Sequence, residues 1–268
     1  MFVVPSTTLK NPKIKYGSNQ SFIMDASAQW DLADKEFLHT SSSAKKPVIR
    51  KYVVIHEKRV PVDRVTQIKN NFEGQMSSRN VGQAQNLWTG AIDLRNKALV
   101  PDILREELNE SRKIQADLVI LILQNRDQDV YSSFKYLADR IFGFHTMVFV
   151  EKSNFRKGYW NESGLDQYVG NIMMKANLKF EGINHTVESS SPNFGNITKT
   201  LKDTLVLGAD VTHPSGGALP GCPSIAAVVG SVEDTGGKFL GSIRLQGEAN
   251  KEVSTGRRRR WSIANEDR

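Results

Sequence analysis

The side chains best suited to chemistry form two pairs, each with the four-residue spacing that places both members on one face of a helix. Tyr131 and Lys135 form one pair, and Lys175 and Lys179 form the other. Two ammonium groups on one helix face repel each other unless an anion lies near both. A lysine and a phenolic hydroxyl beside the free N–H groups of a helix start can bind a terminal phosphate. Taken singly these residues are commonly solvated or packed, but their combination favours a phosphate site.

One carboxylate, Asp210, has the setting of a metal ligand. It follows the apolar run 205–209, which predicts a buried strand that ends in a carboxylate, followed by a turn and a second buried strand at 223–230. Nucleases of the ribonuclease H type place their first metal ligand in this way, because divalent metals prefer oxygen ligands on a rigid edge. Asp210 alone does not make a two-metal site.

Strand and helix signals alternate around the two pairs. Apolar runs predict strands at 51–56, 117–123 and 145–150, and helical spacing predicts helices at 63–72, 101–114, 130–142 and 165–178. Such repeated units predict an α/β fold, a Rossmann-like domain with a parallel sheet over residues 46–185. Its ligands are expected beyond the carboxyl ends of the strands, at helix starts. No Gly-x-Gly-x-x-Gly follows a strand, so a dinucleotide cofactor is not expected.

Three further strands are predicted after a connector at 186–200. They span 204–210, 224–232 and 238–245, and glycine-rich turns that include Gly236 and Gly237 separate them. This pattern predicts an antiparallel meander.

The composition suits a folded protein with a polyanionic partner. The 268 residues carry a formal net charge of +7, and 39% of them are hydrophobic, which allows a core and attracts nucleic acid. A basic protein with no nucleic-acid role is the plainer alternative. The single cysteine, Cys222, excludes an internal disulfide and fits a reducing compartment.

The sequence gives no reason to expect a membrane partner. No apolar run approaches the roughly 20 residues that span a bilayer, and the first residues do not form a secretory signal. A cytoplasmic location is expected. The arginine run 257–260 makes the nucleus an alternative location.

Several segments resemble a known family. The strings Gly208-Ala209-Asp210-Val211-Thr212-His213-Pro214 and Pro223-Ser224-Ile225-Ala226-Ala227-Val228-Val229-Gly230 resemble the opening of the PIWI domain of eukaryotic, fungal-like Argonaute proteins. The two residue pairs, with 144–147 and 177–184, match the order of the guide 5′-phosphate pocket of the Argonaute MID domain, and 13–17 and 28–37 resemble the preceding linker.

The resemblance implies a division of the chain. Residues 1–45 would be a linker segment, 46–185 the Rossmann-like MID domain, and 186–253 a connector with the truncated first strands of a ribonuclease H-like PIWI domain. Residues 254–268 would be a basic, disordered tail. The chain would thus be a fragment, and the remainder of the PIWI domain would be missing.

The resemblance also implies residue roles. Tyr131 would stack on the first guide base and offer its hydroxyl to the 5′-phosphate. Lys135 and Lys179 would contact that phosphate directly. Lys175 would help to neutralise it.

Two further expectations follow from the resemblance. Relatives often carry, at the position of Met147, a Gln that can donate a hydrogen bond in the pocket. Met cannot donate such a hydrogen bond, so Thr146 is expected to make this contact instead. The loop 124–129, with Asn125, Arg126 and Asp127, corresponds to the segment that senses the first guide base.

In a complete PIWI domain, Asp210 would be the first metal-ligating carboxylate of a Mg²⁺ site. The family needs a second acidic residue, a third Asp and usually a final His. Glu252, or Glu248, falls near the second position, while Glu266 and Asp267 lie too near the end to supply the others. This chain is therefore expected to require no cofactor and to lack cleavage activity.

The sequence thus predicts a module that binds the 5′-phosphorylated end of small guide RNA in RNA silencing, without a complete slicer site. The alternative is a metal-dependent, guide-directed endoribonuclease whose site is completed elsewhere. A third reading is a nonfunctional truncated product that aggregates through an unpaired sheet edge.

Overall fold

The computed structural model describes residues 11–25, 27, 32, 34–41, 48–151, 162–188, 201–214, 221–234 and 236–246. It separates into two compact units. One unit is Lys15–His185, and the other combines Met1–Ile14 with Thr186–Arg268.

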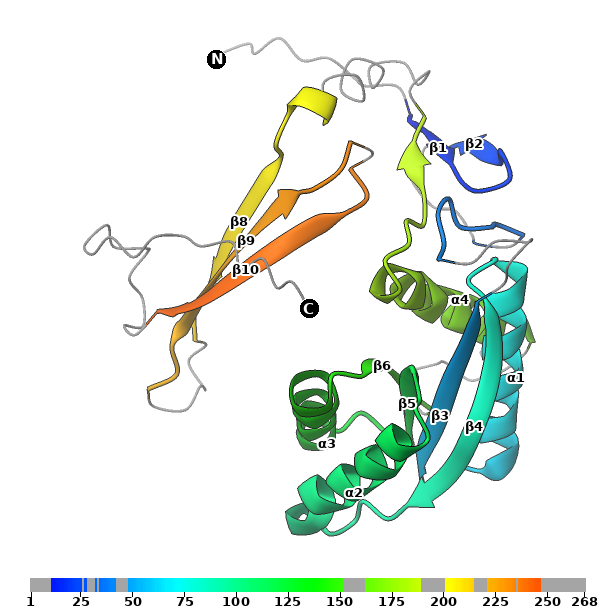
Figure 1. Ribbon diagram of the computed structural model, residues 1–268, viewed down its shortest axis with the longest axis vertical. Helices are drawn as coiled ribbons and strands as arrows, with labels where there is room; N and C mark the ends of the chain where they lie inside the picture. Colours follow the sequence, from blue (N-terminus) through cyan, green and yellow to red (C-terminus); the bar gives the residue numbers. More distant parts are fainter. Residues whose placement is uncertain are drawn as a thin grey trace. The chain divides into compact units, whose positions relative to one another are not determined.

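A four-stranded parallel sheet forms the centre of the Lys15–His185 unit (Figure 1). Its strands are β3 (Ile49–Glu57), β4 (Gln83–Ile92), β5 (Leu118–Leu123) and β6 (His145–Val150), in the order β4-β3-β5-β6. Every residue of β5 is buried, as expected of a central strand covered on both faces. The predicted Rossmann-like α/β fold is confirmed.

The strand β4 is absent from the sequence prediction. Its sequence contains Asn, Gly and Ala, residues that are depleted in strands, and it shows no continuous apolar run. β4 lies at the edge of the sheet and pairs with β3 alone, so it buries less of its surface. Its pairing with β3 is parallel, with one register shift between Tyr52 and Val53.

Helices cover both faces of this sheet (Figure 1). Two hydrophobic clusters divide the core: α1 (Val62–Ser78) and α4 (Glu162–Lys179) pack on one face, and α2 (Val100–Lys113) and α3 (Gln128–Lys135) on the other. The short 3₁₀ segment η1 (Lys97–Leu99) precedes α2. The four predicted helices are confirmed, and the predicted helix at 130–142 consists of two parts.

The second part of that helix is the π-helical segment η2 (Tyr136–Phe142), which follows α3 directly. The helix starts at the N-cap residue Asp127, whose side chain accepts a hydrogen bond from the backbone N–H of Val130. Val130 and Phe134, four residues apart, are both buried on the sheet. Gly143 ends the segment in the left-handed conformation, with φ of 74°.

The segment before β3 belongs to the same unit. It contains β2 (Ser21–Ile23) and the last residue of β1 (Lys13–Lys15). Phe37 is buried, and the carbonyl group of Phe37 lies only 2.4 Å from the position that a Cβ atom on Gly17 would occupy. Trp30, in the same segment, lies outside the described residues.

The other unit contains an antiparallel sheet. Its strands are β8 (Leu207–Thr212), β9 (Ser224–Ser231) and β10 (Phe239–Gln246), in the order β10-β9-β8, which confirms the predicted meander. The unit also contains β7 (Thr186–Val187) and the 3₁₀ segment η3 (Leu201–Asp203). The predicted tail at 254–268 lies outside the described residues.

Asp210 does not lie at a strand end, and its strand is not buried. It is the fourth of the six residues of β8, pairs with Ala227, and is exposed, as are most residues of that strand. The apolar run 205–209 predicted burial, but burial depends on what packs over a strand, which the strand sequence does not specify. None of the helices in the described part of the chain could span a membrane.

Candidate phosphate-binding site

Three of the predicted site residues meet at the start of β6, where α4 ends and where the helix formed by α3 and η2 passes. Lys135 is the last residue of α3, Lys179 is the last residue of α4, and Thr146 is the second residue of β6. The site therefore lies at the amino ends of the strands. The expectation of a site beyond their carboxyl ends is wrong for these residues, because the helices that follow β5 and β6 run back toward the amino edge of the sheet.

Two ammonium groups converge on one hydroxyl. Lys135 Nζ lies 2.5 Å from Thr146 Oγ1, and Lys179 Nζ lies 3.4 Å from the same atom. Lys179 Nζ also donates to the Thr146 carbonyl oxygen, at 2.9 Å. Thr146 is 2% exposed, so both lysine side chains reach inward to meet it.

A carboxylate completes this group. Thr146 Oγ1 donates to Asp139 Oδ1 at 2.7 Å, and Lys135 forms an ion pair with Asp139. The hydroxyl thus accepts from two ammonium groups and donates to one carboxylate, which uses its full hydrogen-bonding capacity. Lys135, Asp139, Thr146 and Lys179 are called the lysine cluster below.

The electrostatics of the lysine cluster show an excess of positive charge. Burial and, to a smaller extent, the charge of Lys135 lower the pKa of Lys179 to about 8, while Asp139 opposes the shift. Burial also lowers the pKa of His145, with Lys179 contributing. Each shift means that the folded protein disfavours the protonated form. A bound anion would relieve this cost.

The end of α4 favours Lys179. The carbonyl groups in the last turn of a helix carry a partial negative charge, which stabilises a nearby cation by about 0.3–1 kcal/mol. Lys179 occupies such a last turn, whereas Lys135 lies within the helix that continues from α3 into η2. Neither lysine is among the first residues of its helix, so the binding of phosphate by N–H groups at a helix start stays a prediction.

Tyr131 and Lys175 flank the lysine cluster. Tyr131 lies one turn before Lys135 on α3 and is 42% exposed. Lys175 is exposed on α4, and its charge contributes to the lowered pKa of Lys179. In the described part of the chain, no hydrogen bond joins either side chain to the lysine cluster.

Thr146 and Met147 point to opposite faces of β6, as successive strand residues do. Thr146 Oγ1 faces the two lysines, while Met147 is buried in the hydrophobic cluster that includes Phe149. The position of Met147 therefore offers no polar group to the site. Thr146 is thus the polar residue that faces the lysines, but its proton is donated to Asp139 Oδ1, so a hydrogen bond from Thr146 to a phosphate stays a prediction.

The sequence analysis did not identify Asp139 as a residue of the site. Its signal was available, since Lys135 and Asp139 have the four-residue spacing that joins opposite charges on a helix. The contact between Asp139 and Thr146 had no such signal, because it depends on how η2 packs beside β6.

Some side chains of the loop 124–129 make polar contacts within the protein, and others are exposed. Asp127 caps α3 by accepting from Val130 N at 3.1 Å, and it pairs with Lys97. Burial alone would raise the pKa of Asp127, but these partners lower it. Asn125 and Arg126 are exposed. The role of the loop in sensing a base stays a prediction.

The described residues do not fit a magnesium site. Asp210 on β8 is directly opposite Ala227 on β9, which is opposite Ile243 on β10, so Asp210 shares its face of the sheet with apolar side chains. In the ranges that the structure covers, no three His, Cys, Asp or Glu side chains could hold a metal ion together. Glu248 and Glu252 lie outside those ranges.

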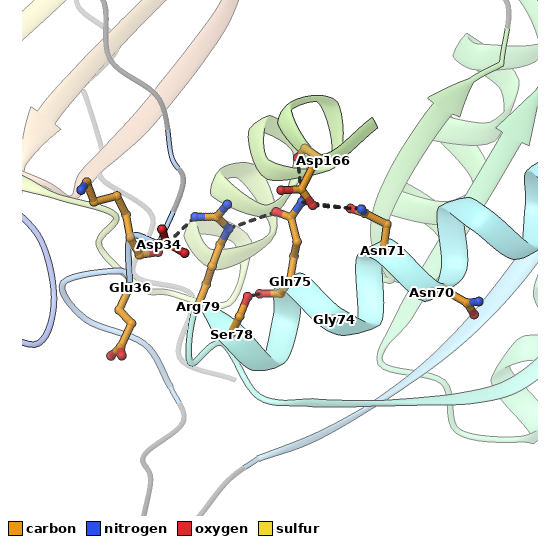
Figure 2. A pocket seen from close by; sticks show the side chains of 10 residues that line it. Asp34, Glu36, Asn70, Asn71, Gly74, Gln75, Ser78, Arg79 and Asp166 are labelled. Atoms are coloured by element: carbon orange, nitrogen blue, oxygen red, sulfur yellow. Dashed lines mark hydrogen bonds between the residues drawn. The ribbon is translucent and has the colours of Figure 1, made fainter. Parts of the chain in front are cut away.

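A separate polar cleft of about 560 Å³ lies on the same unit as the lysine cluster (Figure 2). Asn71 and Gln75 from α1 both donate to Asp166 Oδ1 on α4, each at 3.0 Å. Three carboxylates, of Asp34, Glu36 and Asp166, and two basic groups, of Lys35 and Arg79, line the cleft. None of the predicted phosphate-site residues lines it.

Comparisons with known proteins agree with this fold. The Piwi domain family model matches residues 118–256, just over half of the chain. The chain is 26% identical over 259 residues to the protein argonaute of Schizosaccharomyces pombe, covering 92% of this chain and 28% of that protein. It is also 26% identical over 253 residues to protein argonaute-2 of Drosophila melanogaster, covering 94% of this chain and 19% of that protein.

Solved structures show the same fold. The C-terminal lobe of a budding yeast Argonaute superposes with a TM-score of 0.67 and 22% identity, over 93% of this chain and 51% of that one. The Kluyveromyces polysporus Argonaute with a guide RNA gives a TM-score of 0.62 and 22% identity, over 91% of this chain and 30% of that one. This chain thus spans about a quarter of the length of the curated relatives. It belongs to the Piwi domain family, within the Argonaute proteins.

Proposed function

We propose that this chain binds the 5′-phosphorylated end of a small guide RNA in RNA silencing. The observation that carries the proposal is the convergence of Lys135 and Lys179 on the buried Thr146 hydroxyl. A phosphate monoester carries two negative charges and accepts several hydrogen bonds, so it suits two ammonium groups that lie this close together.

The charge balance supports an anion as the ligand. The lysine cluster contains two lysines and a single carboxylate, Asp139, and Lys175 adds a further positive charge nearby. Burial is the main cause of the lowered pKa of Lys179, and the charge of Lys135 lowers this pKa more than Asp139 raises it. A phosphate would restore the balance and would keep Lys179 protonated to higher pH.

The position of Tyr131 suits the base attached to that phosphate. Its ring is exposed and lies one helical turn from Lys135. A base stacked on an exposed aromatic ring gains about 1–3 kcal/mol. Contacts to phosphate fix the position of a strand without reading its sequence, so most of the guide sequence would remain unread.

The test compares two RNAs that differ only at the 5′ end. A labelled RNA with a 5′-phosphate and its 5′-hydroxyl counterpart are titrated with the full chain, and the two dissociation constants are measured by fluorescence anisotropy at several salt concentrations. The phosphorylated RNA is expected to bind more tightly. The difference should shrink as salt increases, because phosphate contacts release counterions.

Two lysine variants localise the effect. Lys179→Ala should remove most of the preference for the 5′-phosphate, since a hydrogen bond to a charged group contributes about 1.5–3 kcal/mol. Lys69→Ala is the matched control, because Lys69 Nζ is occupied by Asn86 and Thr89, at 2.8 and 3.1 Å. Equal affinities of the unaltered chain for both RNAs would refute the proposal.

We further propose that this chain binds without cleaving. A two-metal nuclease surrounds its ions with several carboxylates. Asp210 lies on an apolar sheet face, and no described observation favours the endoribonuclease alternative.

A further inference from the structure

The end of α4 is closed by a capping motif in which Asn177 takes part. Gly182 N donates to the Asn177 carbonyl oxygen at 2.8 Å, and Glu181 N donates to the Leu178 carbonyl oxygen at 3.1 Å. Glu181 has φ of 64°. These are the two bonds and the left-handed residue of a Schellman motif, and they fix the last helical turn, in which Lys179 lies.

The side chain of Asn177 makes a second set of bonds. Its Nδ2 atom donates to the His39 carbonyl oxygen at 3.2 Å and to Asn184 Oδ1 at 3.0 Å. Asn184 in turn donates to the Met174 carbonyl oxygen on α4, at 3.1 Å. Asn177 is 0% exposed and Asn184 is 8% exposed, so both amides depend on protein partners.

The backbone beyond the cap is held by the same N-terminal segment. His39 and Ile183 exchange two hydrogen bonds, of 2.9 and 2.8 Å, and Leu38 N donates to the Asn184 carbonyl oxygen at 3.0 Å. Residues 38–39 thus pair with the chain that leaves α4. Asn177 joins three pieces of structure: the helix end, the turn after it and this N-terminal segment.

Glycine at position 182 leaves room for this arrangement. A Cβ atom on Gly182 would lie 2.1 Å from Asn177 Oδ1, far closer than atoms approach without a bond. A larger residue at 182 would therefore displace the Asn177 side chain. The two positions can be altered separately and should have the same consequence.

We infer that Asn177 is a positioning residue for the lysine cluster: it ties the end of α4 to His39 and Asn184 and thereby holds Lys179 against Thr146. This inference rests on the proposed function. Lys179 lies two residues after Asn177, and its Nζ must reach the Thr146 carbonyl oxygen at 2.9 Å. If the last turn frays, the Lys179 backbone moves and its side chain must be ordered anew when phosphate binds.

The experiment uses the full chain with Asn177→Ala and, as a second variant, Gly182→Ala. Asn71→Ala is the matched control, since Asn71 Nδ2 donates to Asp166 Oδ1 at 3.0 Å near the opposite end of α4 (Figure 2). For each protein, the ratio of the affinities for 5′-phosphorylated and 5′-hydroxyl RNA is measured, together with the melting temperature.

Both cap variants are expected to lower this ratio about tenfold, the effect of weakening one charge-assisted hydrogen bond. Asn71→Ala should keep the ratio of the unaltered chain. A second readout needs no RNA: the pKa of Lys179, followed by NMR of its side chain, should rise from about 8 toward the ordinary value of 10.5 in both cap variants as the ammonium group moves into water.

Three outcomes decide the matter. A fall in the ratio with a changed Lys179 pKa supports the inference. A lower melting temperature with an unchanged ratio and pKa in both cap variants overturns it and leaves Asn177 a purely structural residue, while the proposed function stands. If the unaltered chain shows no preference for the 5′-phosphate, the proposed function fails, and this inference fails with it.

Discussion

Lys179 donates a hydrogen bond of 2.9 Å from its Nζ to the carbonyl oxygen of Thr146, joining the end of α4 to the start of β6. The contact brings an ammonium group into a partly desolvated position, beside the ammonium group of Lys135. Such an arrangement costs free energy in the free protein and becomes favourable when an anion binds.

The first prediction concerns pH. Only protonated Lys179 attracts phosphate, and its pKa in the free protein is about 8. The preference for 5′-phosphorylated RNA should therefore decline as the pH rises above about 8, whereas Lys179→Arg should keep it to higher pH. Titrations of both RNAs between pH 6.5 and 9.5 would measure this. An identical decline in both proteins would contradict the role of Lys179.

The second prediction concerns stability and follows from the same shift. Between about pH 8 and the unfolded value of 10.5, the unfolded chain binds more protons at Lys179 than the folded chain. The contribution of Lys179 to the free energy of unfolding should therefore increase with pH across this window. Denaturant unfolding of the chain and of Lys179→Met should show the unaltered chain gaining stability relative to the variant. A constant difference between them would contradict the shift.

The third prediction concerns the hydroxyl of Thr146. Thr146→Val removes a buried group that bonds Lys135, Asp139 and Lys179 while keeping its shape. The variant should lose about 1 kcal/mol or more of stability, because Asp139 and the lysines lose a partner. The preference for 5′-phosphate should also fall. Thr146→Ser retains the hydroxyl and should restore both quantities, and a failure of serine to do so would show that the methyl group is what matters.

The fourth prediction concerns Asp139. Its charge raises the pKa of Lys179, against the effects of burial and Lys135. Asp139→Asn should therefore lower the pKa of Lys179 below about 8, which NMR of the lysine side chain can follow. Asp166→Asn is a suitable control, because Asp166 is bonded to Asn71 and Gln75. An unchanged Lys179 pKa in Asp139→Asn would show that solvent screens the charge of Asp139 from Lys179.

The fifth prediction concerns catalysis. Asp210 has apolar neighbours across the sheet, Ala227 and then Ile243, so it should bind magnesium weakly. With a guide bound and a fully paired target RNA, no cleavage is expected in magnesium or manganese. Gel analysis of the target checks this. Guide-dependent cleavage that Asp210→Ala abolishes would favour the endoribonuclease alternative.

Much of the fold could be predicted because its signals are local. The run 118–123 is apolar throughout and forms the fully buried β5, and the helices follow from the spacing of residues such as Leu104 and Leu108. The strand β4 could not be predicted in this way. A strand at the sheet edge is less buried and therefore needs fewer apolar residues, so its sequence signal is weak. Its pairing with β3 is a long-range contact, which a local pattern does not indicate.

The candidate site, too, could be predicted only as far as its signals are local. The sequence alone determined which residues could bind phosphate, because the four-residue spacing within each helix is set by helix geometry. Only the tertiary structure decided that Lys135 and Lys179 meet at Thr146, that Asp139 joins them, and that Tyr131 and Lys175 stay outside the direct contacts. Helix geometry acts over a few residues, whereas the meeting of two lysines from different helices at one strand depends on the sheet order and on the packing of α3 and α4 on opposite faces of the sheet.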